Sequence, residues 1–285
     1  MTLRVDTLAE WEAAGVPGLL SVLIPAHNEA GELEGTVRNL VAALDRESVR
    51  HEVLVVNDNS TDATEEILRA LSAELPSVRY VNNVPPNGFG FALRLGLEDF
   101  AGDVVAVVMA DGSDDPEDLL AYYRKLAEGY DCVFGSRFVR GGTVIDYPWP
   151  KLVLNRLGNR MIQLLFLTRH NDVTNAFKVY RRGVIAGLAP LLSYHFNLLV
   201  ELPLKALVRG YRIGVVPNTW RNRKHGISKF KIREMGSRYL FIILYCFLEK
   251  LLSRGDYRGR ALAPSGDVMS ESRTGDEPRR GQRKA

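Results

Sequence analysis

Three short polar segments of this chain carry the side chains that could do chemistry. They are residues 25–29, 57–62 and 111–115, and each is rich in Asp, Asn or Glu. Carboxylate oxygens suit hard divalent cations, and such a cation neutralises the phosphates of a nucleoside diphosphate. Loops and helix N-caps also favour Asp, Asn and Ser, so any one segment alone is equally consistent with a cap. Three of them together favour a binding site.

A parallel sheet would position these segments. Runs rich in Val, Ile and Leu have strand length and alternate with segments of helical spacing. We expect strands at 19–25, 52–57, 78–82 and 104–110, with helices at 32–44, 62–73 and 89–100. This alternation predicts an α/β fold whose mostly parallel sheet has flanking helices on both faces. Ligands of such sheets bind at the carboxyl ends of the strands, where the polar segments begin.

The second half of the chain is less regular. Helices are expected at 152–167, 196–208 and 232–252, and strands at 173–180 and 211–220. After residue 254 the chain is rich in Arg, Gly, Ser, Pro and Glu and poor in large apolar residues. Residues 255–285 are therefore expected to form a disordered tail.

Composition excludes some classes of protein. The 285 residues are 46% apolar and 25% charged, as in globular proteins, and a net charge of +3 predicts no nucleic-acid partner. No apolar run approaches the ~20 residues that cross a bilayer. Residues 1–15 lack the apolar run of a signal peptide. We therefore expect no span of the membrane, and Cys132 and Cys246, each within an apolar run, fit the reducing cytoplasm.

The order of the motifs resembles a known family. The chain reads Ile-Pro-Ala-His-Asn-Glu from 24, Val-Asn-Asp-Asn-Ser-Thr-Asp from 56, Gly-Phe-Gly-Phe-Ala from 88 and Met-Ala-Asp from 109. In this order the motifs resemble the family 2 glycosyltransferases of the GT-A (Rossmann-like) fold. Gly-Ser-Arg-Phe from 135, Asp-Val-Thr-Asn-Ala-Phe-Lys from 172 and Arg-Lys-His-Gly-Ile-Ser-Lys from 223 narrow the resemblance to the dolichol- or polyprenyl-phosphate mannose synthase branch.

This resemblance, which covers roughly residues 19–252, implies a division of the chain. Residues 1–18 would be an N-terminal extension and residues 19–230 the GT-A glycosyltransferase domain. Residues 231–254 would form an interfacial or packing helix, ahead of the tail. The resemblance also implies Mg²⁺ or Mn²⁺ as cofactor.

Roles for single residues follow from the same resemblance. The nucleotide-sugar would be bound by Pro25, His27, Glu29, Val56, Asp58, Met109, Ala110, Asp111 and Ser113. Within this set His27 replaces the family's usual Tyr, and Asp111 would hold the metal. The catalytic residues would be Asp111, Arg137, Arg223 and Lys229. The three cations would converge on phosphates, whose oxygens suit the donor fork of Arg.

Three positions depart from the family pattern. Asn57 replaces the first of two paired acids, Met109 stands where the family has the first Asp of Asp-Ala-Asp, and Ser113 stands where a Gln often helps the metal. Methionine is a poor ligand for a hard cation. Asp111 is then the one clear ligand, with Asp114 or Asp115 as candidates to help it and the diphosphate supplying the rest.

The motifs also bear on the acceptor. A hydroxyl acceptor needs a general base, whereas a phosphate monoester is already ionised near pH 7 and needs only positive charge around it. We therefore expect an inverting transfer from a nucleotide-sugar donor, GDP-mannose or a UDP-hexose, to polyprenyl or dolichyl phosphate. A transferase acting on a sugar hydroxyl and a non-catalytic sugar-nucleotide sensor remain alternatives. A dinucleotide oxidoreductase or a nucleotidyltransferase would need a glycine-rich loop after the first strand, where 25–29 has none.

Two segments suggest a membrane surface as a partner. Residues 239–248 are apolar nearly all round, and Lys and Arg lie on both sides of them; residues 152–167 are a second amphipathic candidate. Apolar helices with cationic flanks insert into the headgroup region of anionic membranes. A core helix or a subunit interface explains 239–248 as well. The expectation is a peripheral protein at the cytoplasmic face of the membrane, bound directly or through a membrane-anchored partner subunit.

Overall fold

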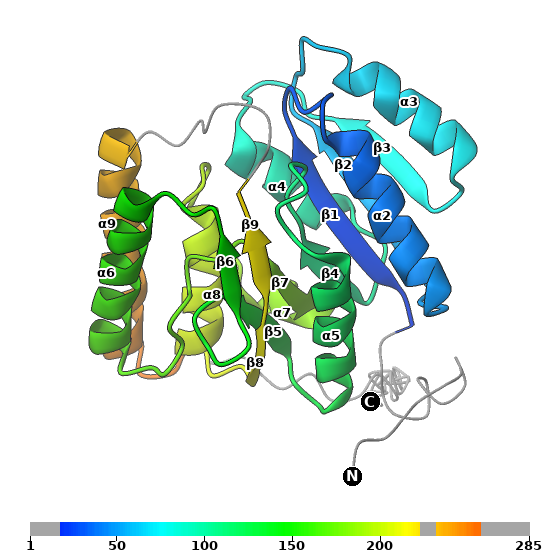
Figure 1. The fold of residues 1–285 in the computed structure, drawn as a ribbon. Coiled ribbons are helices and arrows are strands. Elements are labelled where there is room, and N and C mark those ends of the chain that lie inside the picture. The colour runs from blue at the N-terminus through cyan, green and yellow to red at the C-terminus, as the bar shows by residue number, and fades with distance from the viewer. Residues whose placement is uncertain (1–17, 223–231, 258–285) are drawn as a thin grey trace, which may run out of the picture.

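Buried runs of β-branched and aliphatic residues form the centre of the sheet, as their composition predicts. The computed structural model describes residues 18–222 and 232–257 (Figure 1). Its main sheet has seven strands in the order β3-β2-β1-β4-β7-β5-β8. Their bounds are β1 (Leu20–Ala26), β2 (His51–Asn57), β3 (Val78–Asn82), β4 (Val104–Val107), β5 (Cys132–Ser136), β7 (Lys178–Arg181) and β8 (Ile213–Pro217). Only β7 is antiparallel to its neighbours, β4 and β5, so the expected mostly parallel sheet is confirmed.

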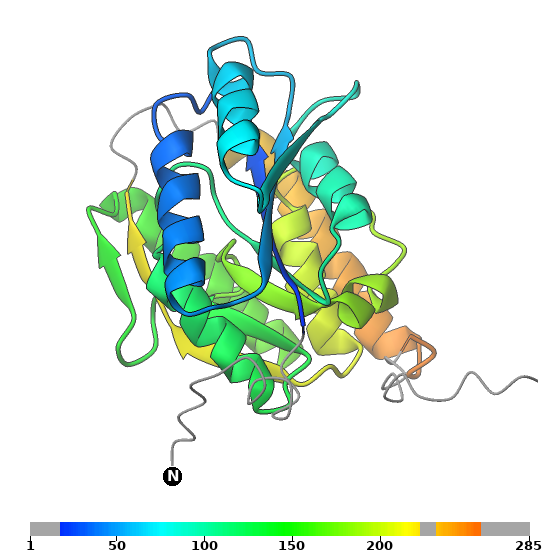
Figure 2. The same cartoon turned by 90° about the vertical axis from the view of Figure 1, so that its right-hand side faces the viewer.

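Helices cover both faces of this sheet (Figure 2). The helices α2 (Leu33–Arg46), α3 (Thr64–Glu74) and α5 (Pro116–Ala127) bury their apolar sides in one core cluster. The helices α4 (Phe89–Asp99), α7 (Arg182–Gly187) and α8 (Leu198–Val208) fill the other. Strand side chains alternate between the two clusters, as in a sheet that is buried on both faces.

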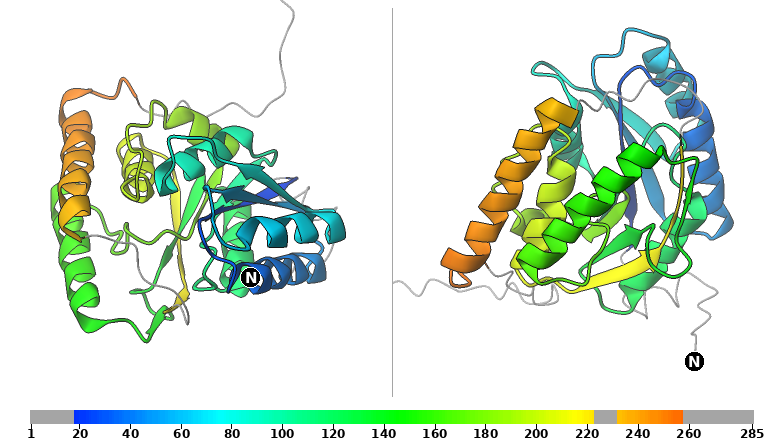
Figure 3. Two further views of the ribbon diagram at one scale, coloured as in Figure 1. Left: turned by 90° about the horizontal axis from the view of Figure 1, so that it is seen from above. Right: turned by 60° about the vertical axis from the view of Figure 1, so that its left-hand side comes forward.

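Two further helices, α6 (Trp149–Phe166) and α9 (Ile232–Leu252), lie side by side beyond α8 (Figure 3). A third core cluster joins them to α8. Its buried members are Ile162, Phe166, Val173, Val200, Leu204, Ile242, Ile243 and Cys246. Within 18–222 and 232–257, no helix combines the length and the apolar character that crossing a bilayer requires.

Both strands expected in the second half of the chain differ from those observed. The strand expected at 173–180 begins only at Lys178, because residues 171–175 form a polar loop. The strand expected at 211–220 is divided at Asn218, whose N–H donates to Ser136 O. Before that residue β8 pairs with β5; after it, β9 (Thr219–Arg221) pairs with β6 (Thr143–Ile145) in a separate two-stranded sheet.

Candidate functional site

The first two polar segments meet at the carboxyl ends of β1 and β2. Pro25 and Val56 are register partners in these neighbouring strands. Just beyond them, His27 Nδ1 lies 2.7 Å from Asp58 O, and the backbone N–H of Glu29 donates to Thr64 Oγ1 over 3.0 Å. His27 and Glu29 are partly exposed, whereas Val56 is fully buried in the core. Val56 therefore packs beneath the carboxyl ends of β1 and β2, and His27 and Glu29 lie where a ligand at these strand ends can reach them.

Asp58 links this surface to the N-terminus of α4. Its buried carboxylate accepts hydrogen bonds from the backbone N–H of Gly88 (2.9 Å) and from Asn83 Nδ2 (2.8 Å). Gly88 has φ of +136°, and at Gly90 a Cβ would lie 2.2 Å from the backbone of Tyr194. Both glycines of the Gly-Phe-Gly motif are thus required by the backbone, one for its conformation and one for close approach.

The third polar segment is a tight loop after β4. Ala110 O accepts from Thr36 Oγ1 of α2 (3.2 Å), and the buried carboxylate of Asp111 accepts from the backbone N–H of Ser113 (3.2 Å). Met109, at the start of the loop, is partly exposed. Asp111 therefore lies at the sheet edge with the other strand ends, as expected from the sequence.

The two acids after Asp111 serve the backbone. Asp114 accepts from the N–H of Met109 (3.0 Å), and Asp115 caps α5 by accepting from the N–H of Glu117 (3.0 Å). Burial, helped by the charge of Asp111, raises the pKa of Asp114 to about 7. Neither contact excludes Asp114 or Asp115 as a helper of Asp111 in holding a metal. Asp111 remains the clear ligand.

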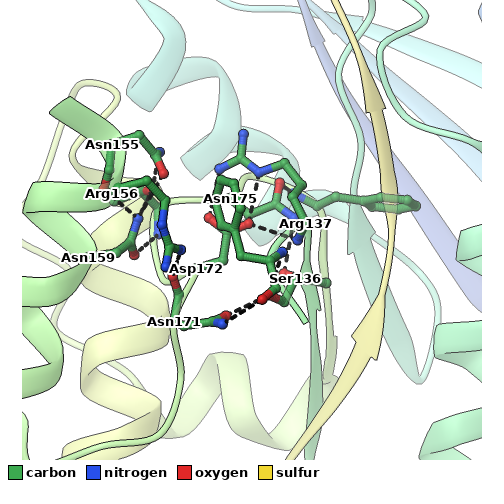
Figure 4. A network of polar contacts seen from close by, with 12 residues as sticks. Ser136, Arg137, Asn155, Arg156, Asn159, Asn171, Asp172 and Asn175 are labelled. Carbon is green, nitrogen blue, oxygen red and sulfur yellow. Dashed lines mark hydrogen bonds and ion pairs between the residues drawn. The ribbon is translucent and has the colours of Figure 1, made fainter. Parts of the chain in front are cut away.

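Arg137 lies at the carboxyl end of β5 and is paired with Asp172 (Figure 4). Its Nε and Nη2 donate to the two carboxylate oxygens over 2.8 and 2.7 Å, and its backbone N–H donates to the same group over 3.0 Å. The guanidinium lies 5.3 Å from the ring centre of Phe138 and 5.6 Å from that of Tyr147. Burial alone would lower the pKa of Arg137, but its hydrogen bonds to Asp172 raise it.

The strand β9 closes one side of the Asp111 loop. The N–H of Arg221 donates to Ser113 O (3.2 Å), and the N–H of Thr219 donates to the carboxylate of Asp118 (2.7 Å). Arg223 and Lys229, which were expected to bind phosphate, lie outside the residues that the structure describes. Their roles stay predictions.

Comparison with known proteins decides the family. The sequence profile of glycosyl transferase family 2 matches residues 21–188, which is more than half of the chain. The chain belongs to glycosyltransferase family 2. It is therefore a glycosyltransferase, as the motifs predicted.

Two curated relatives are also similar to this family 2 chain. The polyprenol monophosphomannose synthase of Mycolicibacterium smegmatis is 30% identical over an alignment of 233 residues, and the match covers 76% of this chain and 86% of that protein. The dolichol-phosphate mannosyltransferase of Pyrococcus furiosus is 30% identical over 215 residues, or 74% of this chain but only 59% of that longer protein.

A solved structure agrees in fold. The glucosyl-3-phosphoglycerate synthase of Mycobacterium tuberculosis, crystallised with Mn²⁺, UDP and glucosyl-3-phosphoglycerate, has a TM-score of 0.64 to this chain. The identity is 20%, and the match covers 88% of this chain and 86% of that one. The GT-A fold expected from the motifs is confirmed.

The donor set of the site suits one kind of metal binding. In the part of the chain that the structure describes, no three His, Cys, Asp or Glu side chains are grouped so as to hold a metal ion. Mg²⁺ is often held by one or two carboxylates together with substrate phosphates, not by a complete protein cage. A single acid at the sheet edge, Asp111, fits that mode of binding.

Two residues near Arg137 were given no role from the sequence. Asp172 is buried and holds Arg137, and Lys178 is 1% exposed at the start of β7. No described residue accepts a hydrogen bond from Lys178 Nζ, and burial lowers the pKa of this group to about 7. The sequence did offer a signal for both residues: Asp172 directly precedes, and Lys178 lies within, the segment 173–180 that was expected to be a buried strand.

Proposed function

We propose that this glycosyltransferase moves a sugar from a nucleoside diphosphate to a polyprenyl or dolichyl phosphate, with inversion, at a membrane surface. The observation that carries the proposal is the 30% sequence identity to a polyprenol monophosphomannose synthase, in a match that covers 76% of this chain and 86% of that relative. The arrangement of Asp111 and Arg137 at the same end of the sheet supports it.

The donor would lie across the ends of β1, β2 and β4. Pro25, His27 and Glu29 would contact the base and ribose, and Asp58 would fix the nucleoside while it holds Gly88. Asp111, together with the donor diphosphate, would hold Mg²⁺ or Mn²⁺. When bound, the metal supplies positive charge that neutralises the leaving diphosphate. GDP-mannose fits the proposal, and a UDP-hexose would need only local changes.

The acceptor phosphate would be positioned by Arg137. Asp172 occupies one edge of the guanidinium, so the phosphate would approach the other edge. The acceptor needs no general base, because its phosphate is already ionised near neutral pH. A phosphate oxygen then forms the bond to the anomeric carbon as the bond from that carbon to the nucleoside diphosphate breaks, which inverts the configuration. Arg223 and Lys229 would add positive charge.

The lipid tail of the acceptor calls for an apolar surface, and α6 and α9 offer one. Their outward sides carry exposed apolar side chains. These are Trp149, Val153, Leu154, Leu157, Met161 and Leu164 on α6, and Leu240, Phe241, Leu244, Leu248, Leu251 and Leu252 on α9. Lys151, Arg160 and Lys250 are exposed among them. Apolar area with cationic side chains suits the headgroup region of an anionic bilayer. We infer a peripheral position at the cytoplasmic face.

A transfer assay tests this function. The purified chain is incubated with labelled GDP-mannose, UDP-glucose or UDP-N-acetylglucosamine, with Mg²⁺ or Mn²⁺, and with vesicles that contain polyprenyl phosphate. We expect label in the organic extract from one donor, with an anomeric configuration opposite to that of the donor. Label only on added sugar acceptors would favour a transferase acting on a hydroxyl. Donor binding without transfer to either acceptor would favour a sensor.

A further inference from the structure

The polarity of the N-terminal half of α6 is the reverse of that expected for a helix on the surface of a protein in water. Its outer stripe, defined as Trp149, Val153, Leu157, Met161 and Leu164, recurs at spacings of four and three residues. The side chains of the stripe are exposed, Trp149 by 75% and Leu164 by 71%. Surface helices normally turn the apolar face inward and the polar face outward. In the N-terminal half of α6, polar residues face the protein.

Those inward polar residues hold one short loop. Asn155 Nδ2 and Asn159 Nδ2 each donate to Thr174 Oγ1 over 2.8 Å. Arg156 Nη1 donates to Asn171 O over 3.2 Å. Figure 4 shows the three side chains directed from α6 toward this loop. Core packing from α6 comes from nearer its C-terminal end, where Ile162 and Phe166 are buried. The N-terminal half is therefore held by these hydrogen bonds and by the guanidinium of Arg156, which lies 4.3 Å from the ring centre of Phe138.

The same loop, residues 171–174, holds the phosphate-binding side of the site. Asp172 takes three hydrogen bonds from Arg137, one from the backbone and two from the guanidinium. Asn171 accepts from Ser136 Oγ over 2.6 Å and donates to Phe138 O over 3.0 Å. Asn171 thus holds the residues on both sides of Arg137, and Asp172 holds the guanidinium of Arg137 itself. Hydrogen bonds from α6 to the loop and from Arg137 to the loop, joined by the backbone of residues 171–174, thus connect α6 to Arg137.

We propose that α6 couples membrane docking to the position of Arg137, so that a bilayer increases turnover even of an acceptor that needs no bilayer. This rests on the proposed function, in which a bilayer covers the outer stripe and Arg137 binds phosphate. Hydrogen bonds that are exchanged for water on opening stabilise a helix only weakly, so the N-terminal half of α6 can open in water. A bilayer that binds the closed arrangement better shifts the population toward it. Arg137 is then held in place more of the time.

The cations of α6 identify the occupant of the stripe. Lys151 and Arg160 are exposed beside the apolar side chains, and no acidic residue occurs in α6. A surface that is apolar and cationic is complementary to an anionic lipid leaflet. A protein partner with an acidic rim would match the same face, and the vesicle experiment below separates the two, because its vesicles contain no protein.

The decisive variants are at Thr174, whose hydroxyl accepts two of the hydrogen bonds that join α6 to the loop. Thr174→Val keeps the shape of the side chain and removes the acceptor of two hydrogen bonds; Thr174→Ser keeps the acceptor. The assay uses a short-chain, water-soluble isoprenyl phosphate as acceptor, with or without vesicles of anionic phospholipid that contain none of it. In wild type and Thr174→Ser, vesicles should raise kcat severalfold with little change in KM. In Thr174→Val the ratio of kcat with vesicles to kcat without them should fall to near one, while flotation shows unchanged vesicle binding.

A second variant and a second readout keep the coupling separate from the proposed function. Leu157→Glu, at an exposed position, should lose both vesicle binding and the increase in kcat. Hydrogen exchange needs no turnover: vesicles should slow exchange at 171–175 in wild type and Thr174→Ser but not in Thr174→Val. Vesicle binding that leaves exchange at 171–175 unchanged in wild type overturns the coupling, as does full stimulation of Thr174→Val. Slowed exchange without transfer to any lipid phosphate keeps the coupling and overturns the proposed acceptor.

Discussion

Two adjacent residues of α9 allow the membrane surface to be tested without disturbing the fold. Phe241 is 61% exposed on the outer side of the helix, whereas Ile242 is fully buried against α8. Phe241→Glu and Ile242→Glu therefore place the same charge in opposite surroundings. They must be made separately, since a double variant would unfold because of position 242 whatever happens at 241.

The two substitutions should affect different properties: the one at 242 should lower stability, and the one at 241 should weaken membrane binding. An unpaired carboxylate at position 242 would cost several kcal/mol, a large part of the ~5–15 kcal/mol by which a domain is stable. At position 241 the effect on stability should stay within about 0.5 kcal/mol, as at other surface sites. Covering a whole Phe side chain is worth about 1.5–3 kcal/mol, so the exposed 61% contributes about 1–2 kcal/mol to membrane binding. Repulsion from an anionic leaflet adds about 1 kcal/mol.

The assay is flotation with anionic vesicles, run beside a thermal melt. Phe241→Glu should melt like wild type and bind vesicles roughly 30- to 100-fold more weakly, since 1.4 kcal/mol is one decade of affinity. Phe241→Leu, the matched control, should float like wild type. Ile242→Glu should melt far lower or aggregate. A folded Phe241→Glu that floats as well as wild type would refute the membrane role of this side of α9.

The remaining predictions concern the polar loop after β4. Asp111→Ala should abolish transfer and greatly weaken metal-dependent donor binding in calorimetry; near-normal turnover with Mg²⁺ or Mn²⁺ would remove Asp111 from the donor site. Met109→Asp, which restores the acid of the family motif, should strengthen metal-dependent donor binding, and unchanged affinity would count against the alignment. Folding raises the pKa of Asp114 from 3.8 to about 7. Ionisation of this acid therefore lowers the free energy of unfolding as the pH rises from about 4 to about 7. Asp114→Asn removes this ionisation. The gain in stability of the variant over wild type should therefore be roughly 2–4 kcal/mol larger at pH 8 than at pH 4; equal gains in melts at the two pH values would contradict this reasoning.

The regular half of the fold could be predicted because each strand there is a buried run between polar ends. Residues 19–25 and 104–110 are such runs; β1 lies within one residue of the expected bounds, and β4 begins as expected and ends three residues early. The helix α5 was not predicted, although Asp115 followed by Pro116 is a helix-start signal and Asp115 does cap it. The strand expected at 211–220 was too long, because periodicity does not reveal a chain that leaves one sheet for another at Asn218.

The candidate site could be predicted in part for a geometric reason. The carboxyl ends of parallel strands lie at one edge, so polar residues after β1, β2 and β4 had to come together. The pairing of Arg137 with Asp172 could not be predicted in that way. It spans 35 residues and depends on β7 being antiparallel, which brings the start of β7 to the end of β5. The pattern of Val, Ile and Leu carries no information on that direction.

The helix at 239–248 shows why composition could not choose between membrane and core. A helix that is apolar all round is normally buried on every side, in a large core or within a bilayer. In α9 one side is core and the other is exposed: Ile242, Ile243 and Cys246 pack in the third core cluster, and Phe241, Leu244 and Leu248 are exposed. The packing side fixes the helix to α8, and only the other side is available to lipid. The two interpretations of the sequence are therefore not exclusive. The inner side can be altered only at the expense of the fold, while the outer side can be altered freely and decides the membrane question.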